Sequence, residues 1–245
     1  MILVLGGTAE ARELAGALCA DGVLVTTSLA GRVARPRLPD GEVRIGGFGG
    51  PEALARWLAE HATAAVIDAT HPFAERISAS AGQACAATSI PLLRLERPGW
   101  SERPGDRWIW VDDLGQAAAA LAPLGERVFL TTGRQGLTAF ANVTDVWFLI
   151  RCVDPPDPPL PPHSAVVLDR GPYTLSGELA LIDTHRIEVV VTKDSGGPHT
   201  EAKLDAARER GLRVVIVRRP PRPDVAAVTD VSEAVRWARA HAHPG

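Results

Sequence analysis

Cysteines, aromatic residues and long apolar runs are scarce in this 245-residue sequence, and each scarcity excludes a class of protein. The three cysteines, Cys19, Cys85 and Cys152, lie far apart, so neither a disulfide framework nor a structural zinc site is expected. Aromatic residues make up only 5%, with Tyr173 the sole tyrosine, which disfavours a platform for stacking nucleic-acid bases. No apolar run approaches the length that spans a membrane.

The net charge of the chain points to no macromolecular partner. The formal net charge is -3, with 22% charged and 46% hydrophobic residues, a composition typical of a soluble globular protein. It gives no support for nucleic-acid binding, and no obligate protein partner is evident. The first residues predict a strand rather than a signal peptide. We therefore expect a cytoplasmic protein of one large or two small domains.

The stretch from Met1 to Arg12 predicts a buried strand, a tight turn and the start of a helix. Its apolar residues run directly into Gly6-Gly7, and the N–H groups of such a turn can hold a pyrophosphate. Against the dinucleotide-binding pattern G-x-G-x-x-G/A, Gly6 matches the first glycine, Thr8 replaces the second, and Ala11 is accepted at the third. Taken alone, this match is weak, and an ordinary strand-to-helix turn explains it better.

The end of the second predicted strand, 23–27, indicates which dinucleotide would bind. In dinucleotide folds an acidic residue here binds the ribose 2′-hydroxyl and selects NAD. This sequence has no acid at that place; Ser28 and Arg32 instead offer a hydroxyl and a guanidinium, which suit a 2′-phosphate. A solvated loop arginine is the alternative for Arg32. Together with the first turn, the pattern favours NADPH over NADH.

Strands and helices alternate along the rest of the chain, which predicts parallel sheets with helices on both faces. The pattern of residues 65–98 recurs at 189–220, and that of 108–117 recurs at 226–234. The repeat predicts an α/β protein of two Rossmann-like domains, 1–123 and 124–245, with parallel sheets. Equivalent edge strands in the two halves could exchange partners.

Two proline-containing segments are expected to be connections. Residues 154–162 carry six prolines in nine positions, which predicts a stiff, extended spacer rather than a helix or an inner strand. The segment 218–223, Arg-Arg-Pro-Pro-Arg-Pro, could be a loop or an anion-binding patch.

Ligands of parallel sheets bind beyond the carboxyl ends of the strands, so the loops there carry the candidate chemistry. In the first half these loops are mostly neutral and rich in glycine, whereas the second half presents Arg134, Arg151, Arg170 and Lys193. This division suggests a cofactor on one side and an anionic substrate on the other.

Two further candidates have competing explanations. His71 could donate a proton or orient a nicotinamide, although a local hydrogen bond that shapes the turn with Pro72 is the simpler explanation. Lys193 and Asp194 could form an acid/base pair, or they could bind backbone groups or substrate carboxylates.

Several motifs together closely resemble precorrin-6A reductase of the cobalamin (vitamin B12) pathway. The resemblance covers essentially the whole chain in the right order, and its most diagnostic segments are Asp-Ala-Thr-His-Pro-Phe-Ala at 68–74 and Thr-Lys-Asp-Ser-Gly-Gly at 192–197. Segments 6–12, 94–100 and 131–134, with Lys203, complete it. The sequence departs from the family pattern at Pro198, where members often have another glycine.

The resemblance implies NADPH-dependent reduction of one double bond of precorrin-6A to give precorrin-6B, without a metal. Residues 1–123 would bind NADPH, and residues 124–245 would bind the tetrapyrrole carboxylates. The pyrophosphate would be held by Gly6, Gly7, Thr8 and Ala9, and the 2′-phosphate by Ser28 and Arg32. Thr70 and His71 would lie near the nicotinamide and macrocycle. Substrate would be bound by Arg134, Lys193, Ser195, Gly196 and Gly197.

Three other functions compete with this hypothesis. The substrate could be the cobalt-containing precorrin of the anaerobic branch. A methyltransferase also uses glycine-rich turns after strands, but it should not depend on a 2′-phosphate. A non-catalytic sensor could bind a dinucleotide without turnover.

Overall fold

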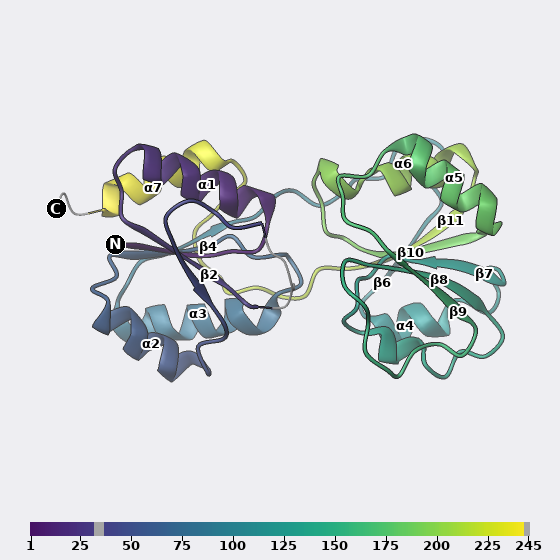
Figure 1. Ribbon diagram of the computed structural model, residues 1–245, viewed down its shortest axis with the longest axis horizontal. Helices are drawn as coiled ribbons and strands as arrows, with labels where there is room; N and C mark the ends of the chain where they lie inside the picture. Colours follow the sequence, from purple (N-terminus) through teal and green to yellow (C-terminus); the bar gives the residue numbers. More distant parts are fainter. Residues whose placement is uncertain (32–36, 243–245) are drawn as a thin grey trace. The chain divides into compact units, whose positions relative to one another are not determined.

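The computed structural model describes residues 1–31 and 37–242 and contains two parallel six-stranded sheets (Figure 1). The chain forms two compact units: unit 1 comprises residues 1–98 and 220–245, and unit 2 comprises residues 99–219. Each unit has one sheet with helices on both faces. The expected fold class, two Rossmann-like α/β halves, is therefore confirmed.

In unit 1 the strand order is β12-β5-β4-β1-β2-β3, and every pair is parallel. The strands are β1 (Ile2–Leu5), β2 (Val25–Leu29), β3 (Glu42–Ile45), β4 (Ala65–Asp68), β5 (Leu92–Leu95) and β12 (Ala227–Val228). One face carries α1 (Ala9–Ala20) and α7 (Val231–His241), and the other carries α2 (Pro51–Glu60) and α3 (Glu75–Thr88).

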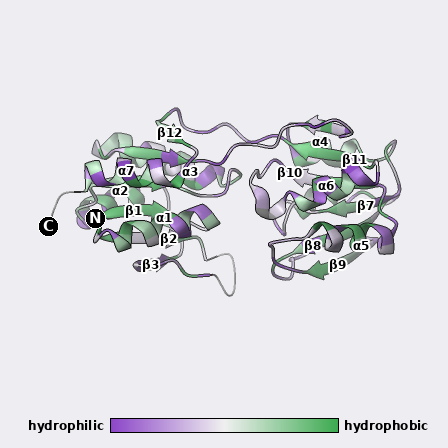
Figure 2. Ribbon diagram, turned by 90° about the horizontal axis from the view of Figure 1, so that it is seen from above, coloured by the Kyte–Doolittle hydropathy of each residue, from purple (hydrophilic) through white to green (hydrophobic). Residues whose placement is uncertain are grey.

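The first strand shows why this sheet forms. Ile2 and Val4 pack with residues of α1 and α7, whereas Leu3 and Leu5 pack with residues of α2 and α3. Alternate side chains of a strand point to opposite faces, so an uninterrupted apolar run is what a sheet covered on both faces requires. Figure 2 shows the same pattern along the sheets, where apolar strands lie between helices of mixed polarity.

In unit 2 the strand order is β6-β11-β10-β7-β8-β9, again all parallel. The strands are β6 (Trp108–Val111), β7 (Arg127–Leu130), β8 (Trp147–Cys152), β9 (Ser164–Leu168), β10 (Val189–Lys193) and β11 (Arg213–Val217). Helices α5 (Leu175–His185) and α6 (Ala202–Glu209) cover one face. On the other face lie α4 (Leu114–Ala119) and the 3₁₀ helix η1 (Leu137–Phe140), and a second 3₁₀ helix, η2, spans Pro198–Thr200.

Both sheets obtain one edge strand from the other half of the chain. β6 pairs with β11, and β12 pairs with β5, so the exchange of edge strands that the sequence left open takes place. The compact units consequently divide after residues 98 and 219, whereas the sequence repeat placed one division near Pro123. The boundaries differ because the repeat follows chain order, while the units follow strand pairing.

Several local features of the chain can be compared with what the sequence indicates. Asp113 caps α4 by accepting from the N–H of Gln116, and Asp230 caps α7 by accepting from the N–H groups of Ser232 and Glu233. Residues 154–162 form neither helix nor strand, as expected. The turn after β7 leads only into the short η1, because residues 142–145, Asn-Val-Thr-Asp, are poor helix formers. The strand at 164–168 was not expected.

Membrane-spanning helices and metal-binding clusters were sought within the described ranges. None of the helices there combines the length and apolarity that a membrane crossing requires. Across the same residues, His, Cys, Asp and Glu side chains form no cluster suited to a metal ion.

Unit 2 contains buried charge. Arg151 and Glu178 form an ion pair whose side chains are 4% and 1% exposed, and the Arg151 guanidinium stacks 3.6 Å from the ring centre of Tyr173. Lys203 is also buried; its ammonium lies 4.6 Å from the ring centre of Trp100 and donates to the Thr200 carbonyl. Burial, assisted by the Arg151 cation, lowers the pKa of Lys203 to about 7.

This lowered pKa predicts a pH-dependent stability. Between about pH 7 and 10.5 the unfolded chain keeps a proton on Lys203 that the folded chain has lost, so raising the pH across this range favours the folded state. Lys203→Met should therefore remove part of the rise in stability, as measured by urea unfolding at several pH values. Parallel profiles for the variant and the wild type would contradict the assignment.

The turn after β1 predicts a second stability effect. A Cβ on Gly6 would lie 2.7 Å from Cγ2 of the buried Thr27, so Gly6→Ala should destabilise the protein by about 1 to 3 kcal/mol, measured by thermal unfolding. Gly47→Ala is the matched control, because a Cβ there meets nothing within 4 Å. An equal effect of both substitutions would argue against a steric cause.

Candidate functional site

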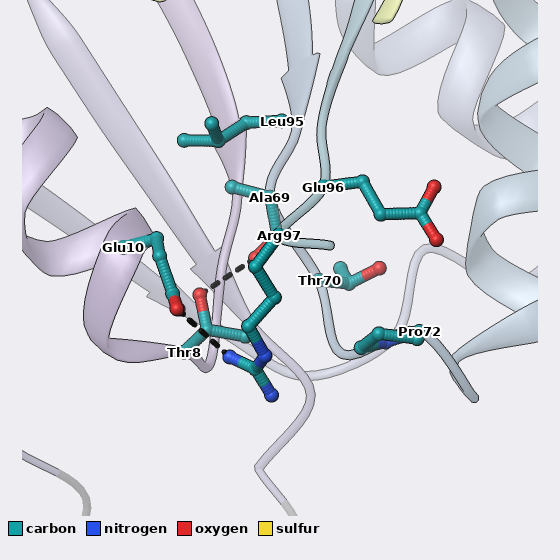
Figure 3. A pocket seen from close by; sticks show the side chains of 8 residues that line it. All are labelled: Thr8, Glu10, Ala69, Thr70, Pro72, Leu95, Glu96 and Arg97. Carbon is teal, nitrogen blue, oxygen red and sulfur yellow. Dashed lines mark hydrogen bonds and ion pairs between the residues drawn. The ribbon is translucent and has the colours of Figure 1, made fainter. Parts of the chain in front are cut away.

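The turn between β1 and α1 is tied to the loop after β4 by Thr8. The Thr8 hydroxyl accepts from the backbone N–H of Ala11 at 3.1 Å and donates to the Ala69 carbonyl at 2.8 Å (Figure 3). It therefore caps α1 and bridges two loops at once. A second glycine, which the dinucleotide pattern would place here, could do neither.

Different constraints require glycine at the two positions of this turn. Gly6 approaches Thr27 too closely for a side chain, and its N–H donates to the Ser28 carbonyl at 2.9 Å. Gly7 has φ +115°, and among the described residues no atom would lie within 4 Å of a Cβ there. The backbone at Gly7 therefore passes an open space at the amino end of α1, where the helix dipole favours an anion.

One acidic side chain also lies at the start of α1. Glu10 forms an ion pair with Arg97 at 2.9 Å (Figure 3). Burial opposes ionisation of Glu10, but its own backbone N–H and the Arg97 guanidinium hold its pKa below the usual value. The carboxylate is thus neutralised locally. The small pocket here is lined by Thr8, Glu10, Ala69, Thr70, Pro72, Leu95, Glu96 and Arg97.

The structure adds an arginine that sequence reasoning missed. Ser28 at the end of β2 pairs in register with Arg44 of β3, and Nη1 of Arg44 lies 3.4 Å from the Ser28 hydroxyl. The guanidinium also donates to the carbonyls of Gly46 and Gly47 and stacks 3.8 Å from the ring centre of Phe48. The pairing of β2 with β3 brings Arg44 to Ser28. Arg32 lies outside the described residues.

The loop after β4 is organised by the buried carboxylate of Asp68. One carboxylate oxygen accepts from the N–H of Thr70 at 3.1 Å and from its hydroxyl at 2.6 Å. The other accepts from Ser78 at 2.5 Å and from Arg222 at 3.1 Å. Thr70 is therefore held in one orientation.

His71 makes the local contact that the sequence suggested. The backbone N–H of Phe73 donates to Nδ1 of His71 at 3.2 Å. Because Nδ1 accepts this bond, the neutral ring carries its proton on Nε2. In this state His71 presents an N–H donor, and loss of that proton would leave an imidazolate.

In unit 2 the loop after β10 carries the predicted substrate residues Lys193, Ser195, Gly196 and Gly197. Gly196 and Gly197 have φ +63° and +74°, so the loop needs glycine at both positions. Burial lowers the pKa of Lys193 at the end of β10. The hydroxyls of Ser195 and Thr200 lie 3.3 Å apart.

The side chains around this loop hold it in place. The Asp194 carboxylate accepts from the N–H of Trp100 at 3.0 Å and pairs with Arg219 at 3.2 Å, so it binds a backbone group and a neighbouring cation. Nε1 of Trp100 donates to the Gly197 carbonyl at 3.4 Å, and Lys203 donates to that of Thr200.

Arg134 belongs to the same edge of the second sheet. It follows β7, which lies beside both β8 and β10. Burial raises the pKa of Cys152 at the end of β8, and the Arg134 guanidinium opposes this shift, which places Arg134 close to that strand end. By contrast, Arg151 is engaged in the buried ion pair with Glu178.

Each unit thus gathers its own predicted residues at the carboxyl edge of its sheet. In unit 1 they lie at or after the ends of β1, β2 and β4, which are neighbours around the point where the strand order reverses. Those residues are Gly6, Gly7, Thr8, Ala9, Ser28, Thr70 and His71. In unit 2 they follow the neighbouring strands β7 and β10.

Comparisons with known proteins agree with this architecture. The family model "Precorrin-6x reductase CbiJ/CobK" matches residues 1–239. A "Precorrin-6A reductase" of Rhodococcus erythropolis is 54% identical over 238 residues, which cover 96% of each chain. A protein of the same name from Mycobacterium tuberculosis is 52% identical, with 96% of each chain covered.

More distant relatives carry a related name. A "Cobalt-precorrin-6A reductase" of Priestia megaterium is 32% identical, covering 90% of this chain and 91% of its own. The solved structure "CobK precorrin-6A reductase" superposes with a TM-score of 0.91 at 43% identity, covering 98% of this chain and 96% of its own. The chain therefore belongs to the precorrin-6x reductase CbiJ/CobK family.

Proposed function

We propose that this protein reduces one double bond of precorrin-6A with NADPH, giving precorrin-6B in cobalamin biosynthesis. Family membership over nearly the whole chain supports the reductase activity and the tetrapyrrole class of substrate. Identity is higher with relatives named for precorrin-6A than with those named for cobalt-precorrin-6A, which favours the metal-free substrate.

The observation that carries the choice of NADPH is the pairing of Ser28 with Arg44. Their hydroxyl and guanidinium meet where a dinucleotide fold holds the adenosine ribose, and no carboxylate from β2 stands there. A guanidinium can bind a 2′-phosphate through charge-assisted hydrogen bonds. The open backbone at Gly7 and the start of α1 suit the pyrophosphate. These features support binding of the 2′-phosphate and the pyrophosphate by residues of unit 1.

The substrate side follows from the chemistry of the macrocycle. A precorrin carries several acetate and propionate carboxylates, and the carboxyl edge of unit 2 offers Arg134, Lys193 and the glycine turn at 196–197. Because Trp100 and Lys203 hold this loop, its donors would be oriented before substrate binds.

NADPH, when bound, supplies the hydride for one ring carbon, and a neighbouring ring atom gains a proton. The main task of the chain is then to position two large ligands. We assign the Nε2–H of His71 to holding a carbonyl group of the nicotinamide or the macrocycle by a hydrogen bond, with Thr70 beside it. In this proposal the proton comes from water.

The proposal is tested with purified protein, NADPH and precorrin-6A. We expect NADPH oxidation to accompany a product that is two hydrogens heavier by mass spectrometry. Parallel titrations with NADH and S-adenosylmethionine distinguish a methyltransferase, and cobalt-precorrin-6A tests the other branch. Binding of NADPH without turnover of either tetrapyrrole would leave the sensor as the better hypothesis.

Arg44→Ala should raise the KM for NADPH by about 10- to 100-fold through loss of one charge-assisted contact, and should change the KM for NADH little. Arg32→Ala should act in the same direction if that residue also contacts the 2′-phosphate. Arg56→Ala, which removes an exposed arginine from α2, is the control. Equal losses with both cofactors would exclude Arg44 from this role.

His71→Ala should lower kcat by about 10- to 100-fold, whereas His71→Gln should retain most activity because its amide N–H can replace Nε2–H. Steady-state rates between pH 6 and 9 check this. If both variants fail equally and lose a pH limb that the wild type shows, His71 is instead the proton donor.

A further inference from the structure

Arg222 lies in the segment 220–223, through which the chain re-enters unit 1. Its side chain is only 7% exposed. Nη1 lies 3.1 Å from the Asp68 carboxylate and contacts the Ser78 hydroxyl, while Nη2 donates to the His71 carbonyl at 2.7 Å. One guanidinium therefore contacts three groups around the loop after β4.

These contacts act on the two residues that our proposed function places beside the reacting groups. Asp68 binds both the N–H and the hydroxyl of Thr70, and Arg222 neutralises that carboxylate. The same guanidinium holds the carbonyl of His71, which also accepts from the N–H of Ala74 at 2.8 Å. Thr70 is thus oriented through Asp68, and the backbone of His71 is held directly.

Anchoring of the segment 220–223 is provided by other groups. Arg94 donates to the Pro223 carbonyl at 2.8 Å, and Gly82 leaves room for the Pro223 ring, with 3.2 Å from an added Cβ. Just beyond it, β12 pairs with β5. The Nε of Arg222, in contrast, is buried without a hydrogen-bond partner. Burying a guanidinium with one N–H unpaired costs free energy, and the contacts that Arg222 makes are to the loop after β4. We therefore attribute its burial to the ordering of that loop and not to the anchoring of 220–223.

We propose that Arg222 is a positioning residue of the reductase, which sets the orientation of Thr70 and His71 from outside their loop. The inference rests on the proposed function for these two residues. It assigns Arg222 no contact with substrate or cofactor.

The experiment compares Arg222→Ala and Arg222→Lys with the wild type in steady-state reduction of precorrin-6A. We expect Arg222→Ala to lower kcat by about 10- to 100-fold with a much smaller change in the KM for NADPH, because the ligands bind but are misaligned. Arg222→Lys should recover part of kcat, since an ammonium can pair with Asp68 but cannot also reach the His71 carbonyl in fork geometry.

Two controls separate positioning from general effects. Arg218→Ala removes a neighbouring exposed arginine, which pairs with Asp112 in unit 2, and should leave kcat unchanged. Leu58→Ala removes a buried side chain of α2 and should lower thermal stability without lowering kcat below its unfolding temperature. If Arg222→Ala only lowers stability, as Leu58→Ala does, the inference is wrong.

A readout independent of turnover completes the test. In nitrogen-15 spectra of the histidine rings, with His71→Gln used for assignment, the His71 signals should shift in Arg222→Ala and stay in place in Arg218→Ala. Unchanged His71 signals would overturn the inference. Absence of wild-type reduction with intact His71 signals would count against the proposed function alone.

Discussion

The buried carboxylate of Asp68 is the constraint on which the carboxyl edge of unit 1 depends. It collects hydrogen bonds from Thr70 and Ser78 and an ion pair from Arg222. A buried carboxylate left unpaired costs several kcal/mol, so the groups around it are held together. The order of the loop after β4 and the return of the chain at 220–223 are thus stabilised by the same charge.

Unit 2 also has a buried aspartate at a strand end, with different partners. Asp194, after β10, accepts from the N–H of Trp100 and pairs with Arg219. These residues stand next to the two places where the chain passes between units, after residues 98 and 219. In each unit, therefore, a buried aspartate at a central strand end fastens a crossover segment beside the candidate site.

The carboxyl edges of the two sheets present different chemical groups. The edge of unit 1 presents backbone N–H groups, hydroxyls and the Arg44 guanidinium, which suit the phosphates of a nucleotide. The edge of unit 2 adds Arg134 and Lys193 around a glycine loop, which suits a ligand with several carboxylates. The buried Lys203 stabilises this segment by donating to the Thr200 carbonyl and by contacting the Trp100 ring.

Short-range features were determined by the sequence itself. The run at Ile2–Leu5, the glycine turn, and the caps at Asp113 and Asp230 involve residues within a few positions of each other, so apolar patterning and capping chemistry specify them. The parallel α/β class followed from the alternation of such elements. Even the possibility of strand exchange could be foreseen from the repeat.

Which strands pair and which distant side chains meet was decided only by the tertiary structure. β6 and β12 carry equivalent patterns, so only long-range pairing determines which sheet each one joins. The Ser28–Arg44 and Asp68–Arg222 contacts likewise depend on strand order and on a chain return, not on local spacing. Local sequence can state which groups a loop offers, but parallel pairing and burial connect distant segments and decide which groups meet.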